Sequence, residues 1–404
     1  MCVKISNIEK NIIWMLLFLN ATILLFGDFS SLLRYLNVAI SLILLFVLLF
    51  NKKSRYRLSK YGFQVRWTFV IILLLLANGI YCILYHGVTI KFVFSQIYVY
   101  GVLLLFLPLI DLCERDDKNY DWIIKKLLFF GIIAIIVRII VWFLFNFVGV
   151  DVFHNMAYEA GYEWVRNGRQ RIPLPSLACI VFSYGLSEFL SEKNIQKQIK
   201  GILCVLVVLF YSFFVVDSRA MLLVLVASAI VMYLYQKRKL SRMLLRLCML
   251  FVIAIFVFAT TGILEKYISS IDAWSIIARQ QAFEYYFDLF KENYIWGINL
   301  ITESTDLQRG VGGNFFFADL GTISKFIEYG ALIGFLFIVP LFRMIYISLK
   351  IKTNIKQKMF LFGITIYIIT SCILSQDIYF FRNIILFPFA MCIMEFSSKR
   401  KRFN

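Results

Sequence analysis

The sequence predicts an all-α fold, a polytopic bundle of about twelve transmembrane helices. Of its 404 residues, 61% are hydrophobic and 16% are charged, and the mean hydropathy is +0.81. Soluble globular proteins are about 45–50% apolar and about 25% charged, so this composition excludes a water-soluble fold. The apolar residues also fall into separate runs, whose lengths approach the roughly 20 residues that cross a membrane. We therefore expect residues 1–404 to form a single transmembrane domain.

Each apolar run is expected to be a helix, because lipid offers no hydrogen-bond partner to an open backbone. Short blocks rich in Lys and Arg separate the runs. This pattern is typical of membrane topology, whereas a nucleic-acid-binding protein gathers its basic residues on one soluble face. The net charge of +18 therefore does not indicate a nucleic-acid partner. The runs lie at 12–26, 32–50, 67–85, 92–110, 127–148, 172–190, 201–216, 220–235, 247–264, 326–347, 359–375 and 384–396.

The positive residues also predict which side of the membrane each connection faces. Of the 42 Lys and Arg residues, 28 lie in the two termini and in alternate connections, 12 lie in the other connections and two lie inside runs. Cytoplasmic connections carry the excess of positive charge, so both termini are expected in the cytoplasm. Two long segments, 149–171 and 265–325, are then expected to be large outer, periplasmic loops.

Arginine is the commoner cation on the predicted outer side, where eight of the 12 cations are Arg, against nine of 28 on the inner side. Topology requires only charge, whereas the guanidinium group binds phosphate through two parallel hydrogen bonds. The bias predicts a phosphate or pyrophosphate ligand on the outer side, and chance is the alternative. The two histidines, His86 and His154, are too few for a His-based metal site, so neither a metal nor a cofactor is expected.

The first outer loop combines aromatic, acidic and arginine side chains. Aromatic faces beside carboxylates suit the C–H faces and hydroxyls of sugar rings, and the arginines suit phosphate. The alternative is an interfacial aromatic belt beside a solvated run of charges. The candidate ligand-binding residues of this loop are Tyr158, Glu159, Tyr162, Glu163, Trp164, Arg166, Arg169 and Arg171.

Five arginines elsewhere in the chain carry separate expectations. Arg219 follows a very short turn at the outer membrane boundary, where it faces a lipid phosphate or simply snorkels. Arg279 and Arg309 lie in the second outer loop, and the Gly-rich passage around Arg309 matches no P-loop motif. Arg138 lies mid-run, where a cation costs about 2.5–3.5 kcal/mol, so it is expected to face the bundle or a wet cavity. Arg343, near the inner end of its run, is expected to snorkel.

The order of these features resembles the bacterial O-antigen polymerases of the Wzy type, which are related to the O-antigen ligases. The likeness covers the topology of the whole chain, but its motifs occupy only the part after the first outer loop. One motif lies at the start of a predicted span. The second motif consists of an arginine early in the second outer loop, an acid near the end of that loop and a Gly-containing run in the span that follows. The residues that carry the likeness are Ser218, Arg219, Leu223, Arg279, Asp319 and the run Gly330–Gly334.

The ligases of this superfamily have a His about eleven residues before that first glycine, where this chain has Asp319, and this departure favours a polymerase. The resemblance implies a GT-C-like bundle that performs metal-independent glycosyl transfer at the outer face of the bacterial inner membrane. The donor would be a glycan on undecaprenyl pyrophosphate and the acceptor a lipid-linked repeat unit, in the synthesis of O-antigen lipopolysaccharide or a related surface polysaccharide. The implied protein partner is a chain-length regulator, a polysaccharide co-polymerase.

On this interpretation, Arg219 and Arg279 bind the pyrophosphate, and Asp319 removes the proton of the acceptor hydroxyl. Glu328 and the acids of the first outer loop are substitutes for Asp319. An N-cap of the following helix is the alternative role for Asp319. The residues predicted to bind substrate are Arg138, Glu159, Tyr162, Glu163, Trp164, Arg166, Arg169, Arg171, Arg309 and Glu328.

Two other classes of protein remain open at this point. A flippase for lipid-linked oligosaccharides would also be basic with about twelve spans, but it is expected to carry its charges along a central cavity and to have short outer loops. A cell-wall transglycosylase would act on a peptidoglycan precursor, and its motifs are not evident. The length of the segment 265–325 favours the polymerase over the flippase.

Overall fold

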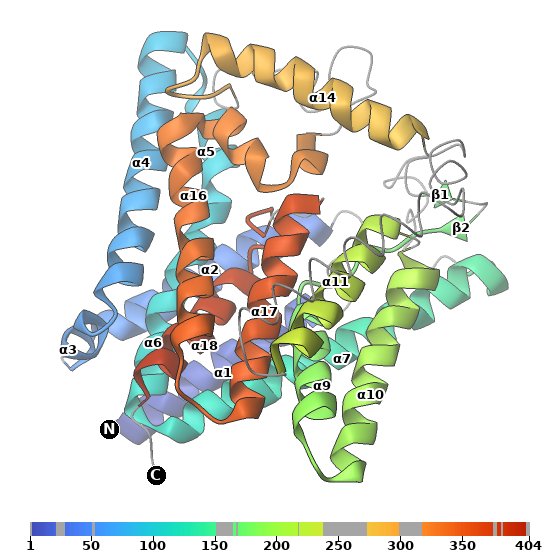
Figure 1. Cartoon of the computed structure of the whole chain (residues 1–404). Coiled ribbons are helices and arrows are strands. Elements are labelled where there is room, and N and C mark those ends of the chain that lie inside the picture. Colours follow the sequence, from blue (N-terminus) through green and yellow to red (C-terminus); the bar gives the residue numbers. More distant parts are fainter. Residues whose placement is uncertain are drawn as a thin grey trace.

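The computed structural model is a bundle of helices (Figure 1). It describes residues 2–21, 29–50, 53–150, 165–166, 169–216, 218–236, 273–298, 317–374, 378–380 and 383–400. The elements of the first part are α1 (Cys2–Ala21), α2 (Phe29–Leu49), α3 (Ser54–Ser59), α4 (Gly62–His86), α5 (Ile90–Ile97), the 3-10 segment η2 (Tyr98–Leu105), α6 (Phe106–Arg115), α7 (Asp117–Phe143) and the π-helical segment η3 (Leu144–Val148).

The later elements are also helical, apart from one pair of short antiparallel strands in which Arg166 lies opposite Arg169. The strands are β1 (Val165–Arg166) and β2 (Arg169–Gln170). The helical elements are α9 (Ala178–Ser191), α10 (Ile195–Phe210), the π-helical segment η5 (Tyr211–Val215), α11 (Arg219–Gln236), α14 (Ala273–Glu292), the 3-10 segment η6 (Phe317–Ile323), α16 (Ser324–Lys350), α17 (Ile355–Leu374) and α18 (Leu386–Lys399).

The apolar runs of the sequence correspond to these helices. Every predicted run falls largely on a helix except 247–264, which lies outside the described residues. The chain is therefore an all-α polytopic membrane protein, while the number of twelve spans stays a prediction. Six described helical segments are long and apolar enough to cross a membrane: Leu32–Leu49, Gly62–His86, Ile90–Arg115, Asp117–Val148, Ile195–Val215 and Leu320–Lys350.

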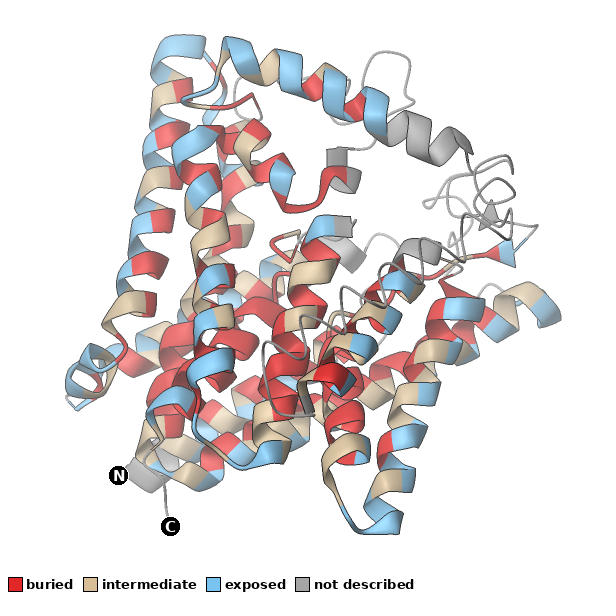
Figure 2. Ribbon diagram, viewed as in Figure 1, coloured by how far each residue is buried: buried red, intermediate tan, exposed pale blue. Residues whose placement is uncertain are grey.

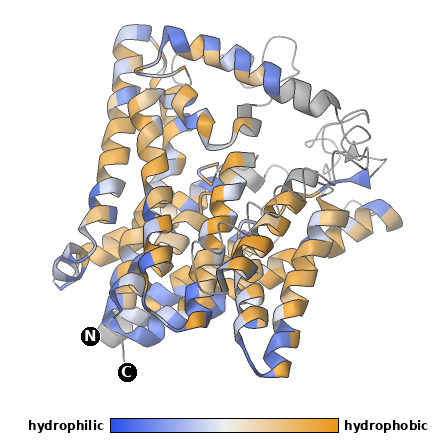
Figure 3. Cartoon of the chain, viewed as in Figure 1, coloured by the Kyte–Doolittle hydropathy of each residue, from blue (hydrophilic) through white to orange (hydrophobic). Residues whose placement is uncertain are grey.

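The outward faces of the helices are apolar, as a surface in contact with lipid requires. On α4, Leu73 and Leu84 are 62% and 73% exposed, whereas the polar Asn78 on the opposite face is fully buried. Figure 2 shows exposed residues along the outside of the bundle, and Figure 3 shows that these surfaces are largely hydrophobic. A soluble protein would expose its polar residues instead.

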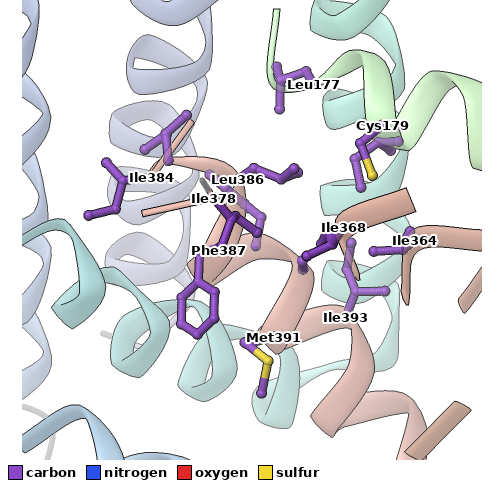
Figure 4. Packing of buried hydrophobic residues seen from close by; sticks show 14 of the residues in the cluster. Leu177, Cys179, Ile364, Ile368, Ile378, Ile384, Leu386, Phe387, Met391 and Ile393 are labelled. Carbon is purple, nitrogen blue, oxygen red and sulfur yellow. The ribbon is translucent and has the colours of Figure 1, made fainter. Parts of the chain in front are cut away.

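The centre of the bundle is a continuous cluster of buried apolar side chains. Figure 4 shows its part between α9, α17 and α18, where Cys179, Ile368 and Phe387 lie in one group. Each of these side chains is at most 2% exposed. Between transmembrane helices this close packing supplies the attraction, because lipid tails are as apolar as the side chains themselves.

Two opposite ends of the bundle differ in composition. Both ends of the described chain lie together at one end (Figure 1), which we call the termini end. Helix α14 lies across the opposite end, which we call the distal end and which also includes the end of α4, η6 and the start of α11. Hydrophilic residues are concentrated at these two ends (Figure 3). This is the pattern expected where helices leave a membrane.

The termini end is held by a network of buried ion pairs. Two nitrogens of Arg115 donate to the carboxylate of Glu9 at 2.5 and 2.9 Å, and Arg115 Nη2 also donates to Asp111 Oδ2 at 2.5 Å. Arg57 Nε donates to Asp111 Oδ1 at 2.6 Å. The network joins α1, α3 and α6. Burial raises the pKa of Glu9, while the nearby Arg115 acts in the opposite direction.

Arg343, which is expected to snorkel, has a partner inside the bundle. Its Nε and Nη2 atoms donate to the two carboxylate oxygens of Glu395 at 2.8 and 3.1 Å, and Glu395 is only 1% exposed. Arg343 thus ties α16 to α18, because a partner 52 residues later in the chain supplies the counter-charge. Such a bidentate pair satisfies the guanidinium without the headgroup region.

Candidate functional site

The start of α11, which is Arg219, lies toward the distal end beside the C-terminal end of α17. The two helices run antiparallel, since the Ser228 and Thr370 hydroxyls are hydrogen-bonded at 3.4 Å, and the rings of Tyr235 and Phe362 stack with centroids 4.0 Å apart. The path along α11 from Tyr235 back to Ser228 and Arg219 therefore leads toward the C-terminal end of α17. The side chain of Arg219 lies outside the described residues.

The segment η6, which contains Asp319, contacts the same end of α17. Gly321 has a φ of 60°, and a Cβ atom built on it would lie 2.2 Å from the carbonyl oxygen of Cys372. Only glycine combines this backbone conformation with so close an approach. The glycine of the Asp319-Leu320-Gly321 sequence thus seats the backbone of η6 against α17.

The alternative role of Asp319 as an N-cap of the following helix is wrong. Helix α16 begins at Ser324, and its N-cap position is occupied by Ile323, which makes no side-chain cap. Asp319 lies four residues earlier, inside η6. Its side chain lies outside the described residues, so its predicted catalytic role stays a prediction.

Helix α14 carries Arg279 past η6. The helix ends at Glu292. Ala282 and Tyr286 of α14 form a small buried cluster with Leu320, Ile327 and Ile298. Arg279 lies about one helical turn before Ala282, and Leu320 follows Asp319 directly. Helix α11 and η6 thus both pack against α17, and α14 packs against η6, while the side chains of Arg219, Arg279 and Asp319 lie outside the described residues.

The end of the first outer loop lies beside the start of α11. Asn146, in η3, binds β2 through both of its amide atoms: its Oδ1 accepts from the Gln170 N–H at 2.7 Å and its Nδ2 donates to the Gln170 carbonyl at 3.2 Å. The Ile172 N–H donates to the Val215 carbonyl at 3.2 Å, which connects this segment to the residues just before α11. Arg169 and Arg171 flank Gln170 on the chain, so both approach the same region.

The structure describes only some of the candidate residues of the first outer loop. Arg169 is exposed, and its guanidinium lies over the ring of Phe147 at 5.3 Å. Arg171 is half-buried, and of Arg166 only the backbone is described. The other predicted residues, namely Tyr158, Glu159, Tyr162, Glu163, Trp164 and Arg309, lie outside the described residues.

Arg138 lies inside the bundle, on the buried face of α7. It is 3% exposed, and its Nη1 donates to the Ala134 carbonyl one turn earlier at 3.0 Å. It interacts electrostatically with Tyr211 of η5, whose hydroxyl donates to the Ile172 and Pro173 carbonyls at 3.2 and 3.0 Å. Arg138 therefore lies beneath the segment that leads from β2 to α9, rather than among the ends of α11, α14 and η6.

A break near the start of α16 is the main irregular feature of the distal end. Gly330 has a φ of 86°, and the turn that follows α14 contacts the main chain there. The Ala331 N–H donates to the Tyr294 carbonyl at 2.8 Å, and the Ile298 N–H donates to the Ile327 carbonyl at 2.9 Å. The first turn of α16 is thus a separate unit, which main-chain hydrogen bonds attach to residues 294–298.

The buried amide of Asn78, on α4, joins the two parts of this contact. Its Nδ2 donates to the Trp296 carbonyl at 2.9 Å and to the Tyr329 carbonyl at 3.3 Å. The rings of Tyr81 and Trp296 stack beside it with centroids 4.4 Å apart. Asn78 was not among the predicted site residues, although a lone Asn inside an apolar run is a signal that it has a partner elsewhere in the bundle.

The first turn of α16 carries a buried ion pair. Lys325 Nζ lies 2.5 Å from Glu328 Oε2, and the two side chains are 5% and 13% exposed. The ammonium also lies over the rings of Tyr100 and Tyr329, at 5.9 and 5.8 Å from their centroids. Glu328 was among the predicted residues, but Lys325 had been counted only as an outer cation. The spacing of three residues on one helix was the signal for this pair.

The fold and this site define the class of the protein as an all-α polytopic membrane protein, in which helix ends and one crossing helix assemble charged segments at the distal end. Among the described residues, no group of three or more His, Cys, Asp or Glu side chains could hold a metal ion. Comparison of the chain with protein-family models and with curated proteins finds no match.

Proposed function

We propose that this protein is a membrane glycosyltransferase that polymerises undecaprenyl-pyrophosphate-linked repeat units into O-antigen or a related surface polysaccharide. The distal end would then face the periplasm, and both termini would lie in the cytoplasm of a bacterium with the protein in its inner membrane. The observation that supports this proposal is the chain of contacts in which α11 and η6 both pack against α17 and α14 packs against η6, since these segments carry Arg219, Arg279 and Asp319.

The reaction needs two kinds of group. The acceptor sugar hydroxyl is a poor nucleophile, and a carboxylate removes its proton as the new bond forms. The leaving pyrophosphate gains negative charge, which fixed cations stabilise in a site of low dielectric constant. We assign proton removal to Asp319 and the pyrophosphate to Arg219 and Arg279, with Arg169 and Arg171 as further contacts at the start of α11.

The bonds balance without a metal or a redox partner. The acceptor oxygen forms a bond to the anomeric carbon of the donor glycan, and its proton passes to Asp319. The bond between the anomeric carbon and the pyrophosphate oxygen breaks, and the pyrophosphate retains the electron pair. The products are a glycan longer by the donor length on the acceptor lipid and free undecaprenyl pyrophosphate.

The test is lengthening of the glycan by purified protein. Undecaprenyl-pyrophosphate-linked repeat units, extracted from a strain that lacks the gene, are incubated with the protein in detergent, and the products are resolved by length. The Ala variants of Arg219, Arg279 and Asp319 are each expected to lose about 100- to 1,000-fold in rate, as when one group that stabilises transition-state charge is removed. The control is Lys291→Met, in an exposed pair with Asp288 on α14.

The same assay separates a polymerase from a flippase. Detergent has no second compartment, so a flippase leaves the repeat units at their original length, while a polymerase gives a ladder. If the wild-type protein gives no ladder, or if all three Ala variants retain the rate of Lys291→Met, the proposed function is wrong.

A further inference from the structure

The pair Lys325–Glu328 is a buried charged group that the proposed reaction does not use. Both residues lie on the first turn of α16, and the ammonium lies between a carboxylate oxygen and two tyrosine rings. Glu328 is the more exposed member, at 13% against 5% for Lys325. The carboxylate is therefore the more accessible member of the pair.

The position of this carboxylate is fixed by the main chain. The break at Gly330 separates the first turn of α16 from the rest of the helix, and residues 294–298 hold it through hydrogen bonds to Ile327 and from Ala331. Asn78 adds a hydrogen bond to the Tyr329 carbonyl. Groups on both sides of Glu328 are thus bonded to other segments, which is the rigid support that a binding site needs.

Glu328 lies close to the segments that carry the proposed catalytic residues. Ile327, the residue before it, packs with Leu320 of η6 and with Ala282 and Tyr286 of α14. Leu320 follows Asp319, and Ala282 lies one turn after Arg279. A ligand that reaches both of those segments therefore passes close to the first turn of α16.

The contact with Lys325 decides what the carboxylate can do. An ammonium at 2.5 Å already donates a charge-assisted hydrogen bond to one oxygen of this carboxylate. A carboxylate has two oxygens and can accept hydrogen bonds from more than one donor. This arrangement suits binding of hydroxyl groups and is poor for proton removal.

We infer that Glu328 binds adjacent hydroxyls of the acceptor sugar and that Lys325 is a positioning residue, which holds the Glu328 carboxylate in place through their ion pair. This inference rests on the proposed function. Asp319 remains the group that removes the proton, and Glu328 holds the sugar whose hydroxyl reacts. Loss of either member of the pair should therefore weaken acceptor binding rather than slow the chemical step.

The experiment measures the lengthening rate against the concentration of the extracted lipid-linked repeat units. Lys325→Met and Glu328→Gln are each expected to raise KM about ten- to hundredfold, because a hydrogen bond to a charged group is lost, with kcat within about twofold of wild type. Lys325→Arg is expected to restore most of the affinity. Lys291→Met and Asp288→Asn, which break the exposed pair of the same spacing on α14, should leave KM unchanged.

The double variant Lys325→Met/Glu328→Gln guards against misfolding, because it leaves no unpaired buried charge. Its KM should equal that of Glu328→Gln, since Lys325 acts only through Glu328. A fall in kcat at constant KM, or wild-type kinetics in both single variants, would overturn the inference and leave the proposed function intact. A wild-type protein that gives no ladder overturns both, so the two failures give different results.

Discussion

The two ends of the bundle use charged residues in different ways. At the termini end, Glu9, Asp111, Arg57 and Arg115 bind one another across three helices, and side-chain ion pairs hold the structure. At the distal end, hydrogen bonds of the main chain join residues 294–298 to the first turn of α16. Charged side chains at the distal end are thus not required to connect residues 294–298 to α16. These side chains are therefore suited to ligand contact.

The largest expected effect is at the termini end. Arg115→Met leaves Glu9 and Asp111 buried without their main cation, and breaking a buried pair in this way costs about 3–5 kcal/mol. We expect a fall of this size in the free energy of unfolding, measured by denaturation of the purified protein in detergent. If the stability changes by less than about 1 kcal/mol, the network does not hold the termini end.

The same variant has a predictable pH dependence. Burial already raises the pKa of Glu9, and removal of Arg115 removes the opposing effect. The folded state then binds a proton on Glu9 more tightly than the unfolded state, so stability falls as pH rises. The destabilisation by Arg115→Met should be smaller at about pH 5 than at about pH 8, and Glu9→Gln in the same background should remove that difference.

The next effect is at the distal end. In Gly330→Ala, the new Cβ would lie 1.8 Å from the Ile295 carbonyl oxygen, at a φ of 86°. Strain of this kind costs about 1–3 kcal/mol and should separate residues 294–298 from α16. Hydrogen exchange of the Ile298 and Ala331 amides should become faster while the helices of the termini end keep their protection. Unchanged exchange at these two amides would contradict the proposed main-chain attachment.

A smaller effect is expected at Asn78. Asn78→Ala removes two hydrogen bonds to the Trp296 and Tyr329 carbonyls, and each such bond contributes about 1 kcal/mol. The melting temperature should fall modestly, and KM for the repeat units should rise more than in Thr68→Ala. Thr68 is the matched control because it is also buried on α4, and its hydroxyl donates to the Gln64 carbonyl of the same helix.

The smallest effect is expected for Lys291→Met. Lys291 and Asp288 are 62% and 73% exposed, and exposed pairs of this kind contribute about 0–1 kcal/mol. Stability, KM and kcat should all stay within the error of measurement. A substantial loss would mean that charge on α14 matters in general, which would weaken the contrast between Lys325 and the exposed pair.

The sequence was sufficient for features that depend on local composition. The apolar runs predicted the described helices on which they fall. It was insufficient where the cause lies far away in the chain. Arg343 is paired because Glu395 approaches from α18, and α16 is broken because Tyr294 and Ile295 contact it at Gly330. No local pattern carries that information.

The candidate site shows the same difference between features with a local cause and features whose cause lies far away in the chain. The segments of Arg219 and Asp319 both pack against α17, and that of Arg279 packs against η6, but the alternative capping role expected for Asp319 belongs to the position of Ile323. Lys325 was visible as a cation, yet its burial beside Tyr100 depends on the packing of η2 against the start of α16. Roles that depend on the direction of one side chain require the tertiary structure.

The attachment of residues 294–298 through peptide groups has a consequence for engineering. Peptide groups are the same in every residue, so the attachment places little demand on which side chains surround it, apart from the glycine at 330. Libraries that vary Tyr294, Ile295 and Glu328 together should yield many folded members. The distal end is thus a place where a new saccharide preference could be selected without rebuilding the bundle.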